Sequence, residues 1–114
     1  TAVRYYVMGE RSVEELATDE EIQQMAEIVG ESMDSGAVGF STNRYPPHVG
    51  PDGRSIPGTY AEAKELLGIA KVVGQKKGLM QNVLDFGGQP EFSIKLLKDL
   101  ASTTGDRILF SIGA

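Results

Sequence analysis

Apolar residues recur every three or four positions in three separate stretches of the chain, which is the spacing of an amphipathic helix. The first stretch opens at Thr18, with Glu21 three residues later, and this pair forms the sequence pattern of a capping box. The second opens in the same way with Thr59 and Glu62, and the third opens at Pro90, a favoured first-turn residue. Three helices are therefore predicted, each followed by a glycine suited to end it: Gly36, Gly78 and Gly105.

A short apolar run follows each predicted helix, at 37–40, 79–84 and 108–112. The first and third runs are almost continuously apolar, which is typical of strands covered on both faces. Strands that alternate with helices form parallel βαβ units. The sequence therefore predicts an α/β fold with three or so parallel βα units over residues 18–114, after a lead-in at 1–17 whose apolar part is either a strand or an extended segment.

One predicted connection is much longer than the others. Residues 43–58, between the first strand and the second helix, are rich in proline and glycine. Loops of this length inside compact domains are usually functional or disordered. In a βα barrel such a loop follows the carboxyl end of a strand, on the face where active sites lie.

Composition narrows the classes of function. The chain has 114 residues, enough for one small domain, and a formal net charge of -5 at pH 7. It has no basic stripe, which disfavours nucleic-acid binding, and no apolar run near eighteen residues, so no membrane span is expected. Cysteine is absent, which excludes disulfides and thiolate metal sites. We expect a cytoplasmic protein that binds neither nucleic acid nor membrane.

Three motifs follow one another in a specific order. Residues 6–11 read Tyr-Val-Met-Gly-Glu-Arg, and residues 36–42 read Gly-Ala-Val-Gly-Phe-Ser-Thr. The long loop then carries Tyr-Pro-Pro-His at 45–48, Asp-Gly-Arg at 52–54 and Pro-Gly-Thr at 57–59. In order and spacing these segments resemble the D-aminoacylase and N-acyl-D-amino-acid deacylase branch of the amidohydrolase superfamily, in the subgroup called amidohydrolase family 3.

The resemblance extends from Arg4 to about Leu84 and implies a fold and a reaction. Its members are (β/α)8 barrels of the TIM type with one or two divalent metals, usually zinc. A metal-bound water attacks the amide carbonyl of an N-acyl-D-amino acid, so the amide C–N bond is hydrolysed. Because such barrels have about 250 residues, the chain would be a single internal fragment, residues 1–114, with about three of the eight βα units.

The resemblance also implies that the metal ligands lie elsewhere. It places a His-x-His motif in an upstream strand and the catalytic aspartate in a later one. Val83 falls where a metal-binding histidine often occurs, and valine cannot coordinate a metal. We therefore expect no catalytic residue and no metal ligand here, zinc or another divalent metal only in the full-length parent, and an isolated chain that is inactive.

Five residues are candidates for contacting the substrate in the parent. Tyr45 matches the family tyrosine before Pro-Pro, and its phenol can bind an oxygen of the substrate or pack the loop. Arg44 can pair with a carboxylate through two bonds. His48 is the single histidine, too few ligands for a metal site, which leaves a solvated loop residue or a substrate contact. Ser41 and Gln81, on the first and second strands, can point into the site.

Two other interpretations stay open. Free amides at a helix start can hold an anion, so one alternative is a stand-alone small α/β module that binds a small anion at the Gly87-Gly88 turn, although a simple turn also explains these residues. Alternatively, the chain is a self-associating structural fragment without activity. Strands cut from a barrel have exposed edges that pair with other chains, and Phe40, Met80 and Phe110 would be uncovered. We therefore expect a homo-oligomer.

Overall fold

The computed structural model describes residues 1–113. Along the chain its elements are α1 Ala2–Met8, the 3-10 helix η1 Gly9–Ser12, α2 Asp19–Asp34, β1 Gly39–Asn43, α3 Ala63–Gln75, β2 Leu79–Asp85, α4 Pro90–Thr104 and β3 Ile108–Gly113. The three strands are parallel and form one sheet in the order β1-β2-β3. The predicted α/β class is confirmed, and the arrangement is consistent with a slice of a TIM-type barrel.

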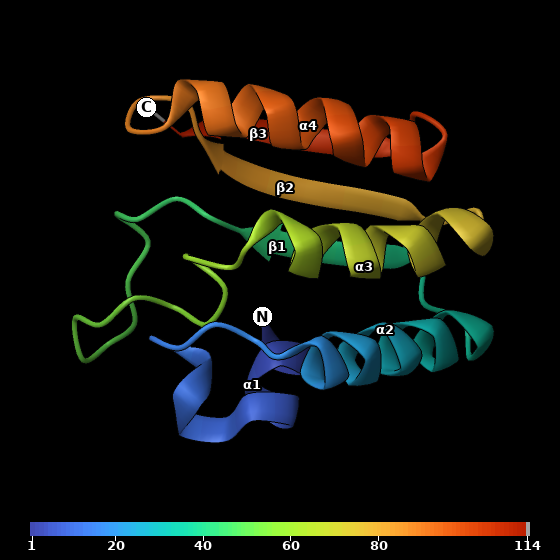
Figure 1. Cartoon of the computed structure of the whole chain (residues 1–114), viewed down its shortest axis with the longest axis horizontal. Helices are drawn as coiled ribbons and strands as arrows, with labels where there is room; N and C mark the ends of the chain where they lie inside the picture. The colour runs from blue at the N-terminus through green and yellow to red at the C-terminus, as the bar shows by residue number, and fades with distance from the viewer. Residues whose placement is uncertain (114) are drawn as a thin grey trace.

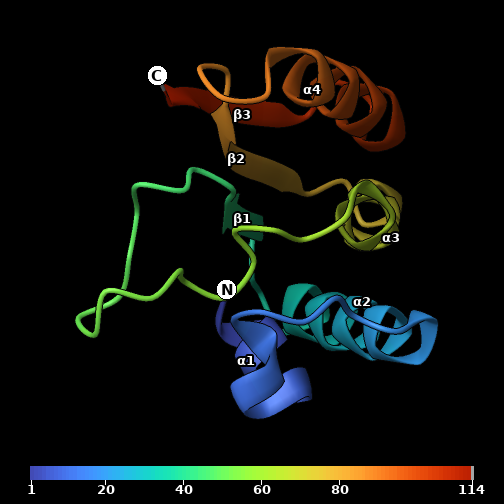
Figure 2. The same cartoon turned by 60° about the vertical axis from the view of Figure 1, so that its left-hand side comes forward.

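Helices α2, α3 and α4 lie side by side on one face of the sheet (Figure 2). Within residues 1–113 no helix covers the opposite face. The long connection from β1 to α3 extends from the end of the sheet where β1 and β2 finish (Figure 1). In a TIM barrel the helices form the outer ring, so in a barrel built from such units the helix-free face would be the interior face.

The core lies between the helices and the sheet. In β2 the even-numbered residues are buried toward the helices, while Gln81 and Val83 face the opposite side and are partly exposed. Strands β1 and β2 approach so closely that a side chain on Gly39 would meet the Leu79 carbonyl oxygen at 1.7 Å, and only glycine fits there. The largest fully buried apolar side chains are Met25, Leu66, Ile69, Val73, Met80, Leu84, Leu96 and Leu100.

The prediction of uncovered apolar residues holds only in part. Met80 is 0% exposed and Phe40 packs against the core, because both lie on the helix-covered face. Phe110 is 48% exposed, since β3 lies at the edge of the sheet. The prediction of strands covered on both faces fails within residues 1–113, where helices cover one face alone.

Two helix starts differ from the predictions. Residues 2–8 form α1 rather than a strand or extended segment, and the Thr1 hydroxyl caps it by accepting from the Arg4 amide. Helix α3 begins at Ala63 with Glu62 as its cap residue, without a side-chain capping bond. The Thr59 hydroxyl instead donates to the Ile56 carbonyl in the preceding loop.

Helix α2 begins as the sequence predicts. The Thr18 hydroxyl accepts from the Glu21 amide, and the Glu21 carboxylate accepts from the Thr18 amide, which completes a capping box. Arg11 donates two further bonds to the same carboxylate, at 2.8 and 3.2 Å. The Arg11 bonds, followed by the Thr18 amide, lower the pKa of Glu21 from its ordinary value of 4.5 to about 2.

This pKa shift predicts a dependence of stability on pH. Because the folded pKa of Glu21 lies below its ordinary value, the ionised carboxylate contributes stability that is complete above pH 4.5 and lost as the pH falls toward about 2. We expect Glu21→Gln to flatten the fall of the thermal midpoint across this interval, measured by circular dichroism. Glu27→Gln, the same change on an exposed site of α2, should keep the wild-type profile. A wild-type profile in Glu21→Gln would contradict the prediction.

Candidate functional site

Polar side chains gather on the helix-free face, from the middle of β1 and the first half of β2 to the carboxyl end of β1. The parallel register pairs Ser41 with Gln81 and Asn43 with Val83. The Ser41 hydroxyl donates to Gln81 Oε1 at 2.6 Å. This bond fixes the carboxamide so that the Gln81 NH2 group, with two protons to donate, is turned away from Ser41.

Asn43 connects the end of β1 to the long loop. Its Oδ1 accepts from the Tyr45 amide at 2.7 Å, which is an Asx turn, and its Nδ2 contacts His48 Nδ1. The His48 amide donates to the Tyr45 carbonyl, and the two rings meet edge to face with centroids 5.3 Å apart. The loop is thereby folded back over the strand end, and we call Ser41, Asn43, Tyr45, His48 and Gln81 the strand-end cluster.

A hollow of about 200 Å³ lies beside this cluster, lined by strand residues that include Ser41, Asn43 and Gln81 and by Ile56 of the loop. A second hollow of about 530 Å³ lies between α1 and the loop segment 50–57. Ligands of parallel α/β folds bind outside the carboxyl ends of the strands. The smaller hollow is therefore the better candidate site, because the chemistry-bearing side chains reach it.

Arg44 lies outside the strand-end cluster. It is buried, its Nε donates to the Ala61 carbonyl at 3.0 Å, and its guanidinium lies 4.5 Å above the centre of the Phe92 ring. Burial lowers the pKa of the Arg44 guanidinium, and the Asp85 carboxylate opposes this effect. The substrate contact expected of Arg44 stays a prediction. In this structure the Arg44 side chain connects the start of the long loop to its end at Ala61, and packs both against Phe92 of α4; we call this contact the Arg44 clip.

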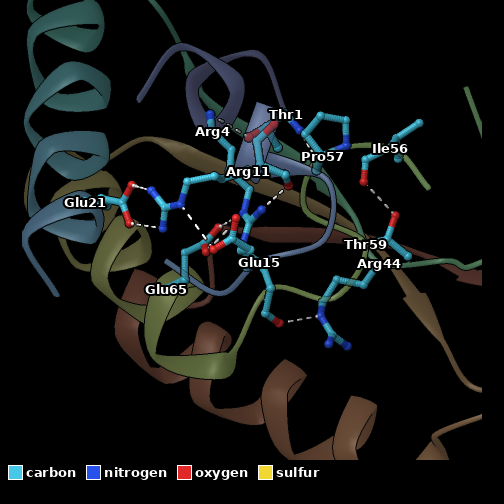
Figure 3. A network of polar contacts seen from close by, with 12 residues as sticks. Thr1, Arg4, Arg11, Glu15, Glu21, Arg44, Ile56, Pro57, Thr59 and Glu65 are labelled. Atoms are coloured by element: carbon cyan, nitrogen blue, oxygen red, sulfur yellow. Dashed lines mark hydrogen bonds and ion pairs between the residues drawn. The ribbon is translucent and has the colours of Figure 1, made fainter. Parts of the chain in front are cut away.

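A buried ion pair joins the N-terminal segment to α3 (Figure 3). Arg4 Nε donates to both carboxylate oxygens of Glu65, at 3.2 and 3.1 Å, and the two residues are 2% and 3% exposed. The other guanidinium nitrogens of Arg4 donate to the carbonyls of Ser12 and Glu15. No local sequence pattern predicts this pair, because its members lie 61 positions apart.

The described residues do not fit a metal ion. Across 1–113, no group of three or more histidine, aspartate or glutamate side chains is placed to hold one. Val83, on the face of the strand-end cluster, offers no ligand atom. None of the helices in this part of the chain is long and apolar enough to cross a membrane.

Comparison with known proteins gives a match in structure alone. No family model and no curated protein matches the sequence. Two solved D-aminoacylase structures match the fold, one a variant in complex with copper chloride and the other a study of the binuclear metal centre. Their TM-scores are 0.72 and 0.71, with 19% sequence identity, and the match covers 96% of this chain and 22% of each D-aminoacylase chain. The chain therefore has the fold of about one fifth of D-aminoacylase, which confirms the resemblance at the level of the fold.

Proposed function

We propose that this chain forms part of the substrate-binding end of a hydrolase that cleaves the amide C–N bond of N-acyl-D-amino acids or related amides. The strand-end cluster carries the proposal, because it reaches the carboxyl end of β1 at Asn43, and parallel α/β folds bind ligands outside the carboxyl ends of their strands. The fold of D-aminoacylase supports it. In this proposal the divalent metal, zinc or another, is held by residues beyond this chain, and the isolated chain is inactive.

The strand-end cluster offers hydrogen-bond donors to a ligand. Because Gln81 Oε1 is occupied by Ser41, its NH2 group is the part of the carboxamide that a ligand oxygen can approach. The carboxylate and the acyl oxygen of an N-acyl amino acid are acceptors without donors of their own. These residues therefore bind and orient the substrate, while the chemical step belongs to groups elsewhere in the intact enzyme.

Replacing Gln81 with leucine tests this assignment in the intact hydrolase that contains the chain. We expect kcat/KM for N-acetyl-D-leucine to fall about 10- to 100-fold, the value of one hydrogen bond to a charged group. Gln23→Leu is the matched control, since Gln23 is exposed on α2 and bonds only to Glu27 among the described residues. Equal activity of both variants would remove Gln81 from the site.

The second arm of the experiment uses the 114-residue chain by itself. Incubated with N-acetyl-D-leucine and zinc chloride, it should release no free leucine above the protein-free rate, because the described residues offer no metal cluster. Measurable turnover would contradict the proposed inactivity. Restoration of activity on adding the remainder of the barrel would support the fragment origin.

A self-associating fragment is the second candidate, and it is compatible with the first. The observation that favours it is the exposed apolar side chains of β3 at the edge of the sheet. Edges of this kind pair with other chains. We propose a homo-oligomer formed through this edge when the chain is isolated.

The backbone amide at the Gly87-Gly88 turn already donates to a carboxylate of the chain. The Gly88 amide donates to Asp85 Oδ1 at 2.8 Å, and a Cβ on Gly88 would lie 2.4 Å from the other carboxylate oxygen. A bound small anion would compete with this carboxylate for the amide. Anion binding at the turn stays a prediction, and the strand-end cluster offers the better-developed site.

A further inference from the structure

The orientation of the Asn43 carboxamide is fixed by the backbone. Asn43 Oδ1 lies 2.7 Å from the Tyr45 amide nitrogen. A backbone N–H only donates, so the atom that faces it must be the carboxamide oxygen. The opposite atom, Nδ2, then faces His48 Nδ1 with its two protons.

This orientation fixes the protonation of the His48 ring. An NH2 group needs an acceptor, so His48 Nδ1 must lack a proton. A neutral imidazole carries one proton, which then lies on Nε2. We infer that Asn43 is a positioning residue that holds His48 as the Nε2-protonated tautomer, so that His48 serves the site as a hydrogen-bond donor to a ligand oxygen.

The same contact excludes two other roles for His48 Nε2. A metal-binding histidine donates its second ring N–H to a carboxylate or carbonyl, whereas Asn43 presents a donor at that position. A general base needs a free lone pair on the nitrogen that meets the substrate, and here that nitrogen carries the proton. A carboxylate or an acyl oxygen is the chemical group that matches the exposed N–H.

Two further contacts hold the ring in this orientation. The His48 amide donates to the Tyr45 carbonyl at 3.0 Å, and the Tyr45 ring meets the imidazole edge to face. Because His48 is exposed, a ligand can reach its Nε2 without moving the loop. The inference rests on the proposed function only for the identity of the ligand, since the tautomer follows from the chain alone.

The tautomer can be measured directly, because His48 is the single histidine of the chain. Two-bond proton–nitrogen NMR spectra of the ¹⁵N-labelled chain, recorded at a pH where the ring is neutral, give the populations of both tautomers. The same sample in urea supplies the reference for a ring without tertiary contacts. We expect a larger Nε2-protonated fraction in the native chain than in urea.

Variants of Asn43 provide the matched test. Asn43→Asp places an acceptor at His48 Nδ1, so the Nδ1-protonated fraction should rise above the urea reference. Asn43→Ala should return the ratio to that reference. Two results would overturn the inference. One is an Nε2-protonated fraction in the native chain that is no larger than in urea, which is also what an unfolded loop would give. The other is an Asn43→Asp variant with the same tautomer ratio as the native chain.

The donor role has a separate readout in the intact hydrolase. His48→Ala should raise KM for N-acetyl-D-leucine about tenfold, the value of one hydrogen bond, and leave the pH profile of kcat unchanged. Loss of one limb of that profile would instead identify His48 as an acid or base and overturn the donor role. The NMR result needs no turnover, so the proposed function can fail while the tautomer assignment holds.

Discussion

Replacing Arg4 with alanine should lower the free energy of unfolding by about 3–5 kcal/mol, the usual cost of leaving one member of a buried ion pair alone. The Glu65 carboxylate would be left buried without its partner, and the carbonyls of Ser12 and Glu15 would lose their donor. Urea denaturation followed by circular dichroism measures the effect. The loss should be large enough to unfold a marginally stable small domain.

Two further variants make this expectation specific to the pair. Arg4→Met combined with Glu65→Leu removes both charges and should recover most of the lost stability, because an apolar pair of similar volume needs no desolvation. Arg11→Ala breaks two ion pairs, with Glu15 and Glu21, but its guanidinium is 44% exposed, so the urea midpoint should fall less than in Arg4→Ala. If Arg4→Ala were as stable as Arg11→Ala, the pair would not be the link between the N-terminal segment and α3.

The isolated chain should sediment as a dimer or larger species at micromolar concentration, and Ile112→Lys should weaken that association about tenfold or more. Ile112 is 67% exposed on β3, whose outer edge has no partner strand within residues 1–113. Phe110 lies on the same face of β3 as Ile112 and Leu109 on the opposite face, and both are about half exposed, so the edge strand is apolar on both faces. A lysine there would have to be desolvated when a second chain covers the edge.

Leu16→Lys is the matched control for this experiment. Leu16 is a large apolar residue with 53% exposure, but it lies before α2 and away from the strand edge. Analytical ultracentrifugation should give the same distribution for Leu16→Lys and for the unmodified chain. A monomeric unmodified chain would contradict the association and favour a stand-alone module.

Local signals predicted the parts of the fold that depend on local interactions. Helix α2 has its capping box at Thr18 and Glu21, and α4 begins at Pro90 and ends at Gly105 in the left-handed conformation. Helix α1 was missed because it is held by contacts with distant residues, and the start of α3 was misplaced because the Thr59 hydroxyl bonds to the Ile56 carbonyl in the loop and does not cap the helix. A chain segment such as 2–8 has no sequence feature that reports its ion pair with Glu65.

The candidate site was predicted to a similar extent. Ser41 and Gln81 are hydrogen-bonded because residues that alternate along parallel strands share a face, and Tyr45 and His48 meet within the loop. Their contact with a substrate stays a prediction. Arg44 was grouped with them, although the alternation places it on the side of Phe40, under the helices. The same alternation identifies Asn43, whose role depends on a turn that sequence spacing alone does not specify.

The Arg44 clip has a consequence for how this surface can change during evolution. It closes the loop at its base, and a bridge between Val49 and Ser55 closes it again near its tip. Residues 50–54 therefore lie outside both closures, so insertions there would cost little entropy and leave Tyr45 and His48 in place. Related chains can lengthen this tip to reshape the larger hollow beside α1, which residues 50–54 line in part, and an engineer can attach a reporter there.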